Sequence, residues 1–323
     1  MKKQILTLLA TTILSLTLLS GCGNADKKAN QVNIGYFNNI THAQALLMKA
    51  EGTLEQELGE DISVNWTAFN AGPAEVEALF SGAIDIGYIG PVPAISANVK
   101  SNQDIQILSS STQAGAILVK RADSDINTVA DLSGKTVAIP QLGNTQHLCL
   151  LHLLSENGLS ATTEGGDVTV TALDNADVAN AMERGDIDAA LVPEPWGATL
   201  LAQGAQMVLD YDQIYENGSY DVAVVVVRKE FMEKNPEIVD TFLRVHEDAT
   251  VIINEDRDAS LSTINQELQN ATGKSLSNDI LTEAFSRITV STELQKDAIE
   301  KFAEISKEQN FISTLPDEKL YVE

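Results

Sequence analysis

Four short loops of the sequence combine glycine, proline and uncharged polar side chains, a composition that suits binding of a small anion. They read GYFNNITH (35–42), YIGPVP (88–93), QLGNTQ (141–146) and VPEPW (192–196). In the third loop, Gly143 lets the backbone approach a ligand closely, and Asn144 or Thr145 can cap the helix that follows. The free N–H groups of the first helical turn then point at the ligand. Taken alone, this loop could also be a well-capped helix start without a ligand.

Three further side chains in these loops could reach the same ligand. His42 can donate a hydrogen bond to it or lie on the surface of a first helical turn, and Trp196 can stack over it or fill the core of a lobe. Glu194 differs from the others, because a carboxylate beside an anion site costs free energy unless a positive group is near. We expect Glu194 either to face away toward a lysine or to meet an amine on the ligand.

The elements that must position these loops form an internal repeat. Segments 74–91 and 176–195 both read as helix, glycine, short strand, loop and proline, with Gly82 equivalent to Gly185. Each glycine is expected to end its helix in the left-handed conformation. Upstream of these segments, strands expected at 32–37 and 62–69 correspond to strands expected at 136–139 and 168–173.

Each half is therefore predicted as β-loop-α-β-α-β, and this alternation favours a parallel sheet with helices on both faces. Ligands of such sheets bind beyond the carboxyl ends of the strands, where the four loops fall. Asp85 and Asp188, at equivalent strand starts, are expected to serve in capping or turns rather than in chemistry.

Two similar α/β lobes require connections, and β-rich segments flank the second lobe. Ile105 to Arg121 and Val222 to Arg228 are predicted as the two strands of a hinge. The first part of lobe 1 is expected over residues 32–115, and lobe 2 with the hinge strands over 116–228. Residues 229–323 are predicted to be mostly helical, with a start near Pro236, and to return to lobe 1.

Composition excludes several classes of partner and chemistry. The 323 residues include 21 Lys+Arg and 46 Asp+Glu, a net charge of -25, which argues against nucleic acid and anionic lipid surfaces. A small anion is not excluded, because salt screens surface charges over about 8 Å. The four scattered histidines form no HExxH or CxxC pattern, so no metal or other cofactor is expected. Without a GxSxG, a P-loop or a Ser-His-Asp grouping, an enzyme is not expected.

The N-terminus predicts export. Lys2 and Lys3 precede an apolar run from Ile5 to Leu19, which has the length of a signal-peptide core. The next residues, LSGC, resemble a lipobox, so 1–21 are expected to be a lipoprotein signal peptide and Cys22 the lipid-bearing residue. An ordinary secretory peptide with an incidental cysteine is the alternative. Residues 22–31 are then an acylated cysteine and a polar tether.

The other cysteine, Cys149, lies in an apolar helical stretch and is expected to be a small buried hydrophobe. With Cys22 acylated, no intramolecular disulfide is possible. These features together predict an extracytoplasmic protein that is held at the bacterial cell membrane by a lipid anchor.

The segments FNAGPAEVEALFSGAIDIGYIGPVPAI, PQLGNTQ and VPEPW resemble the nitrate, sulfonate and taurine substrate-binding proteins of bacterial ABC transporters, in particular the aliphatic sulfonate group. The resemblance covers nearly the whole chain after the signal peptide. It implies an α/β fold of the type II periplasmic-binding class, in which two lobes close on a small anionic or zwitterionic solute. It also implies delivery of that solute to a membrane permease and its ATPase.

By that resemblance, the ligand-binding residues fall on the four loops and on the AGP motif. They are Asn38, Asn39, His42, Gly72, Gly90, Pro91, Gly143, Asn144, Thr145, Gln146, Glu194 and Trp196. An aliphatic sulfonate or taurine is the expected solute, since a sulfonate is fully ionised and needs no proton acceptor. Nitrate, bicarbonate and a thiamine-precursor pyrimidine are the alternatives for the ligand, and a ligand-sensing module is the alternative for the role.

Overall fold

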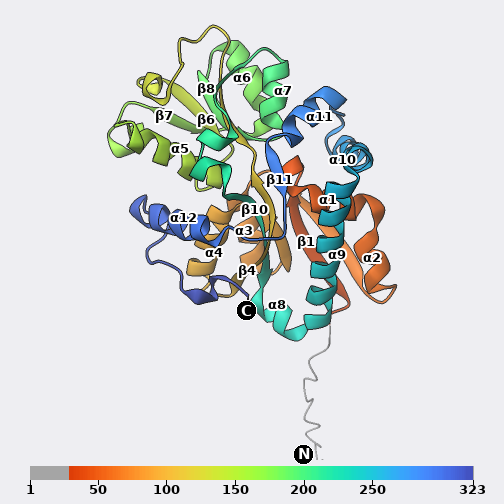
Figure 1. Ribbon diagram of the computed structural model, residues 1–323. Coiled ribbons are helices and arrows are strands. Elements are labelled where there is room, and N and C mark those ends of the chain that lie inside the picture. The colour runs from red at the N-terminus through yellow and green to blue at the C-terminus, as the bar shows by residue number, and fades with distance from the viewer. Residues whose placement is uncertain (1–28, 323) are drawn as a thin grey trace, which may run out of the picture.

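The computed structural model describes residues 29–322, which form two β-sheets with helices packed around each (Figure 1). The first sheet has the order β11 (Ile288–Val290), β4 (Ile105–Ala114), β10 (Asp221–Arg228), β3 (Ile86–Ile89), β1 (Gln31–Phe37) and β2 (Ser63–Phe69). The second has the order β7 (Thr169–Ala172), β6 (Thr136–Ile139), β8 (Ala189–Pro193), β5 (Ala116–Lys120) and β9 (Gln206–Leu209). We call the two units lobe 1 and lobe 2.

The sheets are mixed rather than wholly parallel. In lobe 1, β2, β1 and β3 are parallel, and in lobe 2 so are β7, β6 and β8. The strands that enter each lobe from the other, β10 and β5, run antiparallel to their neighbours. The reason is their direction of entry: each arrives from the cleft, where the parallel strands end, and must run back along the sheet.

Helices cover the sheets as the repeat predicts. Lobe 1 contains the 3-10 turn η1 (Ile40–His42) and helices α1 (Ala43–Glu51), α2 (Thr53–Leu58), α3 (Gly72–Ser81) and α4 (Pro91–Lys100). Lobe 2 contains α5 (Thr145–Glu156), the 3-10 turn η4 (Asn175–Asp177), α6 (Val178–Arg184) and α7 (Trp196–Ala202). Gly82 and Gly185 end α3 and α6 at φ 72° and 74°, in the predicted left-handed conformation.

The equivalence of the two halves extends to single hydrogen bonds. Oδ2 of Asp85 accepts from the backbone N–H of Asn33 at 3.0 Å, at the start of β1. Oδ2 of Asp188 accepts from the backbone N–H of Thr136 at 2.9 Å, at the start of β6. Each aspartate thus joins two neighbouring parallel strands at the end opposite the cleft, which is a structural role.

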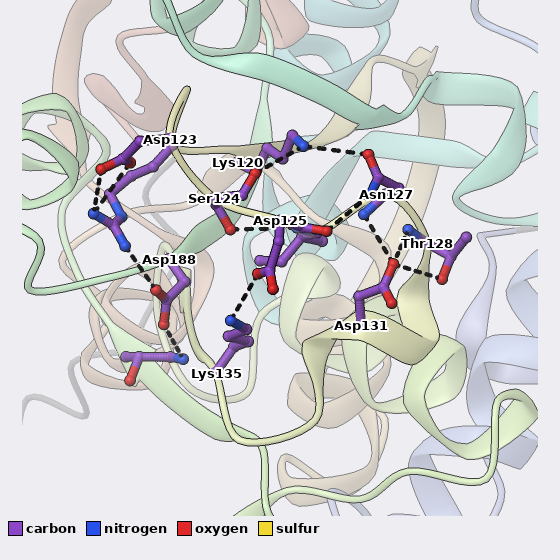
Figure 2. Close-up of polar contacts among 12 residues, drawn as sticks. Lys120, Asp123, Ser124, Asp125, Asn127, Thr128, Asp131, Lys135 and Asp188 are labelled. Carbon is purple, nitrogen blue, oxygen red and sulfur yellow. Dashed lines mark hydrogen bonds and ion pairs between the residues drawn. The ribbon is translucent and has the colours of Figure 1, made fainter.

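An arginine faces each of these carboxylates. Arg228 lies 3.8 Å from Asp85, and Arg121 lies 3.1 Å from Asp188. Figure 2 shows Asp188 in this position, beside the polar contacts that Lys120 and Lys135 make in the same region of lobe 2. These polar contacts lie at the ends of the lobe 2 strands.

The segment Ile105 to Arg121 crosses between the lobes, as predicted, and divides into β4 and β5 at Gly115. The φ of Gly115 is 81°, and a Cβ there would lie 2.3 Å from a methyl carbon of Ile288, so only glycine suits this junction. Val222 to Arg228 differs from the prediction, because it belongs to β10 and pairs wholly within the lobe 1 sheet. The return crossing lies before it, between β9 and β10.

The C-terminal helices are α8 (Lys229–Lys234), α9 (Pro236–Glu255), α10 (Arg257–Thr272), α11 (Asn278–Phe285) and α12 (Lys296–Glu308). Helix α9 starts at Pro236 and buries Ile238, Phe242 and Val245 at helical spacing. Helices α9 and α10 pack on α1 of lobe 1, as predicted. However, α11 packs on α7 of lobe 2, and α12 contacts both α4 and α5, so this segment touches both lobes (Figure 1).

The start of the fold lies slightly earlier than the predicted tether allows. Gln31 is already in β1 and pairs with Ser63, and the backbone N–H of Ala29 donates to Oδ1 of Asn235 at 2.7 Å. The predicted signal peptide and Cys22 lie outside the described residues. Cys149 is buried in α5, as expected. Within residues 29–322, no helix has the length and hydropathy needed to span a membrane.

Candidate functional site

The loops of the two lobes meet around a small cavity of about 30 Å³, which we call the inner pocket. A single water molecule needs about 10–15 Å³ by the same measure, so the inner pocket holds a group of only a few atoms. Its lining contains no charged side chain and comprises Phe37, Asn39, Thr41, His42, Asn70, Ala71, Gly72, Gly90, Pro93, Pro140, Asn144, Thr145, Gln146, Asn175, Pro193 and Val222.

Helix α5 presents its N-terminus to this pocket. Asn144 is the N-cap, and its Oδ1 accepts from the backbone N–H of His147 at 2.8 Å. Among the described residues, no acceptor meets the backbone N–H groups of Thr145 and Gln146, the first two residues of the helix. The hydroxyl of Thr145 is also buried without a partner in the described chain. Three donors therefore converge where the helix dipole favours negative charge.

The opposite wall of the pocket comes from lobe 1. A Cβ on Gly90 would lie 2.4 Å from Oγ1 of Thr145, so the lobes approach each other here to a distance that requires glycine. Nδ2 of Asn70 donates to Oδ2 of Asp174 across the same gap at 3.2 Å. The lobes are thus in contact around the pocket, in a closed arrangement.

His42 contributes a neutral donor to this wall. Its Nδ1 accepts from the backbone N–H of Phe37 at 3.1 Å, which leaves the proton on Nε2. Burial lowers the pKa of His42 to about 3, so the ring carries no charge at physiological pH. The Phe37 ring stacks on the imidazole with 4.3 Å between ring centroids and holds its orientation.

A second cavity, of about 300 Å³, adjoins the inner pocket, and we call it the outer pocket. Phe37, Asn39, Asn70 and Asn175 line both. Asn38 lines the outer pocket, as do Trp196 at the start of α7 and Leu276 from the segment between α10 and α11. Lobe 1, lobe 2 and the C-terminal segment therefore all line the outer pocket.

The sequence-predicted residues divide among these surfaces. The inner pocket is lined by Asn39, His42, Gly72, Gly90, Asn144, Thr145 and Gln146, and the outer pocket by Asn38, Asn39 and Trp196. Pro91, Gly143 and Glu194 line neither pocket. Pro91 is the first residue of α4, and Gly143 adopts φ 84° and donates its N–H to Nδ1 of His147, so both shape the backbone next to the lining.

The structure adds two residues that the loops alone did not suggest. Asn70 directly follows β2, and Asn175, three residues after the end of β7, begins η4. Both line both pockets, and Oδ1 of Asn175 is buried with no partner among the described residues. The internal repeat could have indicated both residues, because each asparagine lies between the second strand of its half and the helix that follows.

Glu194 is fully buried and lies in an ion pair with Arg287. Its Oε1 is 2.8 Å from Nη1 of Arg287, and its Oε2 accepts from the backbone N–H of Ala198 at 2.9 Å. Burial raises the pKa of the Glu194 carboxyl, while the Ala198 amide and the guanidinium oppose that rise. The partner is an arginine rather than the predicted lysine. It comes from the C-terminal segment, and no local sequence pattern connects that segment to the loop of Glu194.

Arg287 also binds two other carboxylates. Its Nε is 2.9 Å from Oδ1 of Asp210, and its Nη2 is 2.5 Å from Oε1 of Glu283 on α11. The guanidinium thereby joins two loops of lobe 2 to the C-terminal segment. No group of three or more His, Cys, Asp or Glu within residues 29–322 is arranged to hold a metal ion.

The model of the NMT1-like family matches residues 25–265, about three quarters of the sequence. The chain belongs to the NMT1-like family. The chain is also similar to the taurine-binding periplasmic protein of Escherichia coli (strain K12), with 32% identity over 235 residues, which cover 72% of this chain and 70% of that protein.

Solved structures show the same fold. The alkanesulfonate-binding protein SsuA of Xanthomonas axonopodis pv. citri, bound to MOPS, superposes with a TM-score of 0.75 at 23% identity, over 90% of this chain and 97% of that one. The nitrate-binding protein NrtA of Synechocystis PCC 6803 gives 0.71 at 13% identity, over 90% and 84%. These matches confirm the predicted periplasmic-binding fold of two α/β lobes.

Proposed function

We propose that this protein is the extracytoplasmic receptor of an ABC importer for organic sulfonates, and that it binds rather than transforms its solute. The observation that carries the proposal is the inner pocket, where uncharged donors from both lobes converge and no carboxylate is present. A sulfonate needs such donors and no proton acceptor. The names of the relatives, which bind taurine and alkanesulfonates, support the same chemical class.

Binding is coupled to closure of the lobes. Gly90 and His42 belong to lobe 1 and Thr145 to lobe 2, so the full set of donors exists only when the lobes meet. A solute that contacts both lobes shifts the population toward the closed form. A permease can then distinguish the loaded receptor by its closed shape, and the ATPase of the importer drives release and transport.

Nitrate is the second candidate, because the inner pocket alone has room for a group of a few atoms. The outer pocket favours a sulfonate, since nitrate has no organic part to fill it. A thermal-shift series with taurine, ethanesulfonate, longer alkanesulfonates, nitrate, bicarbonate and a pyrimidine tests the choice. Stabilisation by sulfonates supports the proposal, and stabilisation by nitrate or the pyrimidine alone contradicts the ligand.

Replacing Thr145 by alanine is expected to weaken sulfonate binding about tenfold or more with little loss of stability. The hydroxyl has no partner in the described protein, and a hydrogen bond to a charged group contributes about 1.5–3 kcal/mol. Isothermal titration with ethanesulfonate measures the change. Thr169→Ala, at an exposed position on β7, is the control, and unchanged affinity in Thr145→Ala would show that the Thr145 hydroxyl does not bind the solute.

We further propose that Cys22 carries the lipid that holds the receptor at the outer face of the cell membrane. The LSGC motif and the preceding apolar run support this. In cells expressing Cys22→Ser, the protein is expected to leave the membrane fraction and to lose incorporated labelled fatty acid. A Cys22→Ser protein that still fractionates with membranes and carries label would contradict the anchor, and Cys149→Ser is the matched control.

A further inference from the structure

The two pockets differ tenfold in size, and this difference bears on the organic part of the solute. The inner pocket, of about 30 Å³, accommodates a head group, whereas the outer pocket, of about 300 Å³, could enclose a much larger group. Phe37, Asn39, Asn70 and Asn175 line both, so a solute whose head group sits at α5 extends directly into the outer pocket.

Half of the residues that line the outer pocket are apolar. Aromatic and aliphatic side chains from lobe 1, from α7 and from the C-terminal segment form it, among them Phe69, Trp196, Leu200, Leu268 and Leu276. Its two charged residues, Asp174 and Lys274, are both exposed to solvent. Oδ2 of Asp174 already accepts from Asn70 at 3.2 Å. The surface therefore provides area on which a hydrocarbon tail can be buried. Beside that area lie uncharged amide and hydroxyl groups, those of Asn38, Asn39, Asn70, Asn175, Thr199, Gln203 and Thr272.

The carboxylate that could have bound an ammonium near the head group is unavailable. Glu194 has no exposed surface and lines neither pocket. Both of its oxygens are already bonded, one to Arg287 and one to the backbone of Ala198. An amino group two carbons from the sulfonate, as in taurine, would therefore find no buried carboxylate among the residues that line the two pockets. The carboxylate in that lining is Asp174, which is exposed to solvent and already bonded to Asn70.

We propose that the solute of this receptor is a sulfonate with a bulky, uncharged, mainly hydrocarbon tail, and that taurine is a poor ligand. This inference rests on the proposed function, because it assumes that a sulfonate head group occupies the inner pocket. It differs from a direct transfer of the taurine specificity carried in the name of the 32%-identical relative.

Isothermal titration of the purified mature protein with ethanesulfonate, taurine, hexanesulfonate and benzenesulfonate tests the inference. Each buried methylene strengthens binding about fourfold, so hexanesulfonate is expected to bind at least tenfold more tightly than ethanesulfonate. Taurine is expected to bind no more tightly than ethanesulfonate. Equal affinity for the two alkanesulfonates would overturn the inference and leave the proposed function intact, whereas failure of all four to bind would overturn both.

Taurine as the tightest ligand would also overturn the inference, and loss of that affinity in Asp174→Asn would assign its ammonium to the outer pocket. A variant that fills the pocket gives an independent test. Ala176 is exposed and lines the outer pocket, so Ala176→Leu is expected to lower the ratio of hexanesulfonate to ethanesulfonate affinity by tenfold or more. Ala122→Leu, at an exposed alanine that lines neither pocket, is the control, and an unchanged ratio in Ala176→Leu would contradict the proposal.

Discussion

Replacing Arg287 by alanine is expected to lower the free energy of unfolding at neutral pH by about 3–5 kcal/mol, the cost of leaving one partner of a buried ion pair alone. Glu194 is fully buried and would lose the guanidinium that neutralises it. Asp210 and Glu283, which the same guanidinium binds, would then add like charges nearby. Urea unfolding followed by circular dichroism measures the change.

The pH dependence of this deficit distinguishes loss of charge pairing from loss of packing. Without Arg287, the pKa of Glu194 rises further, so the deficit should be largest at neutral pH and shrink toward pH 4, where the unfolded chain also begins to bind this proton. Arg244→Ala is the control, because Arg244 pairs with Glu57 at an exposed site and is worth at most about 1 kcal/mol. A deficit in Arg287→Ala that is small, or equal at pH 4 and pH 7, would contradict the role of the ion pair.

Replacing Glu75 by glutamine is expected to stabilise the protein at alkaline pH and to have little effect near pH 4. Glu75 lies on α3 with no exposed surface, and neither carboxylate oxygen has a partner in the described chain. Its Oε1 packs so close to the strands that a Cβ on Gly35 or Gly87 would lie 2.3 or 2.4 Å from it. Burial raises the pKa of this carboxyl well above its ordinary value of 4.5.

The direction of this pH effect follows from where the proton of the Glu75 carboxyl is held. Above pH 4.5 the unfolded chain releases it while the folded protein retains it, so Glu75 lowers stability by up to about 1.4 kcal/mol per pH unit until the folded group ionises. Unfolding curves of Glu75→Gln and the parent protein between pH 4 and pH 9 should therefore diverge with rising pH. Glu77→Gln removes an equivalent charge from the exposed side of the same helix and is the control. Parallel curves for Glu75→Gln would show that Glu75 is ionised in the folded protein.

Features of the fold that depend on neighbouring residues could be predicted from the sequence. The helix ends at Gly82 and Gly185 require a residue that tolerates positive φ, and glycine is the residue that does so at least cost. Asn144 could be placed at a helix start because its side chain caps the backbone three residues ahead. The repeat then placed the loops at a common edge, since parallel strands end at the same side of a sheet.

Features that depend on residues far apart in the sequence could not be predicted from it. Arg287 lies 93 positions from Glu194 in the chain, and no spacing rule connects an arginine after α11 with a loop after β8. The contact of α11 with α7 could not be predicted either, because the apolar face of a helix does not specify which surface it covers. For this reason the sequence left open whether Glu194 faces a lysine or an amine on the ligand, whereas the structure shows it paired with Arg287.

The position of β10 has a consequence for the order in which the protein can form. The strand lies between β3 and β4 in the first sheet, although the whole of the second sheet separates it from them in the sequence. All strands of the second sheet come from one continuous stretch, 116–209, and can pair as soon as that stretch exists. Until Arg228 has been synthesised, the first sheet lacks the strand between β3 and β4, so the chain holds all strands of the second sheet before it holds those of the first.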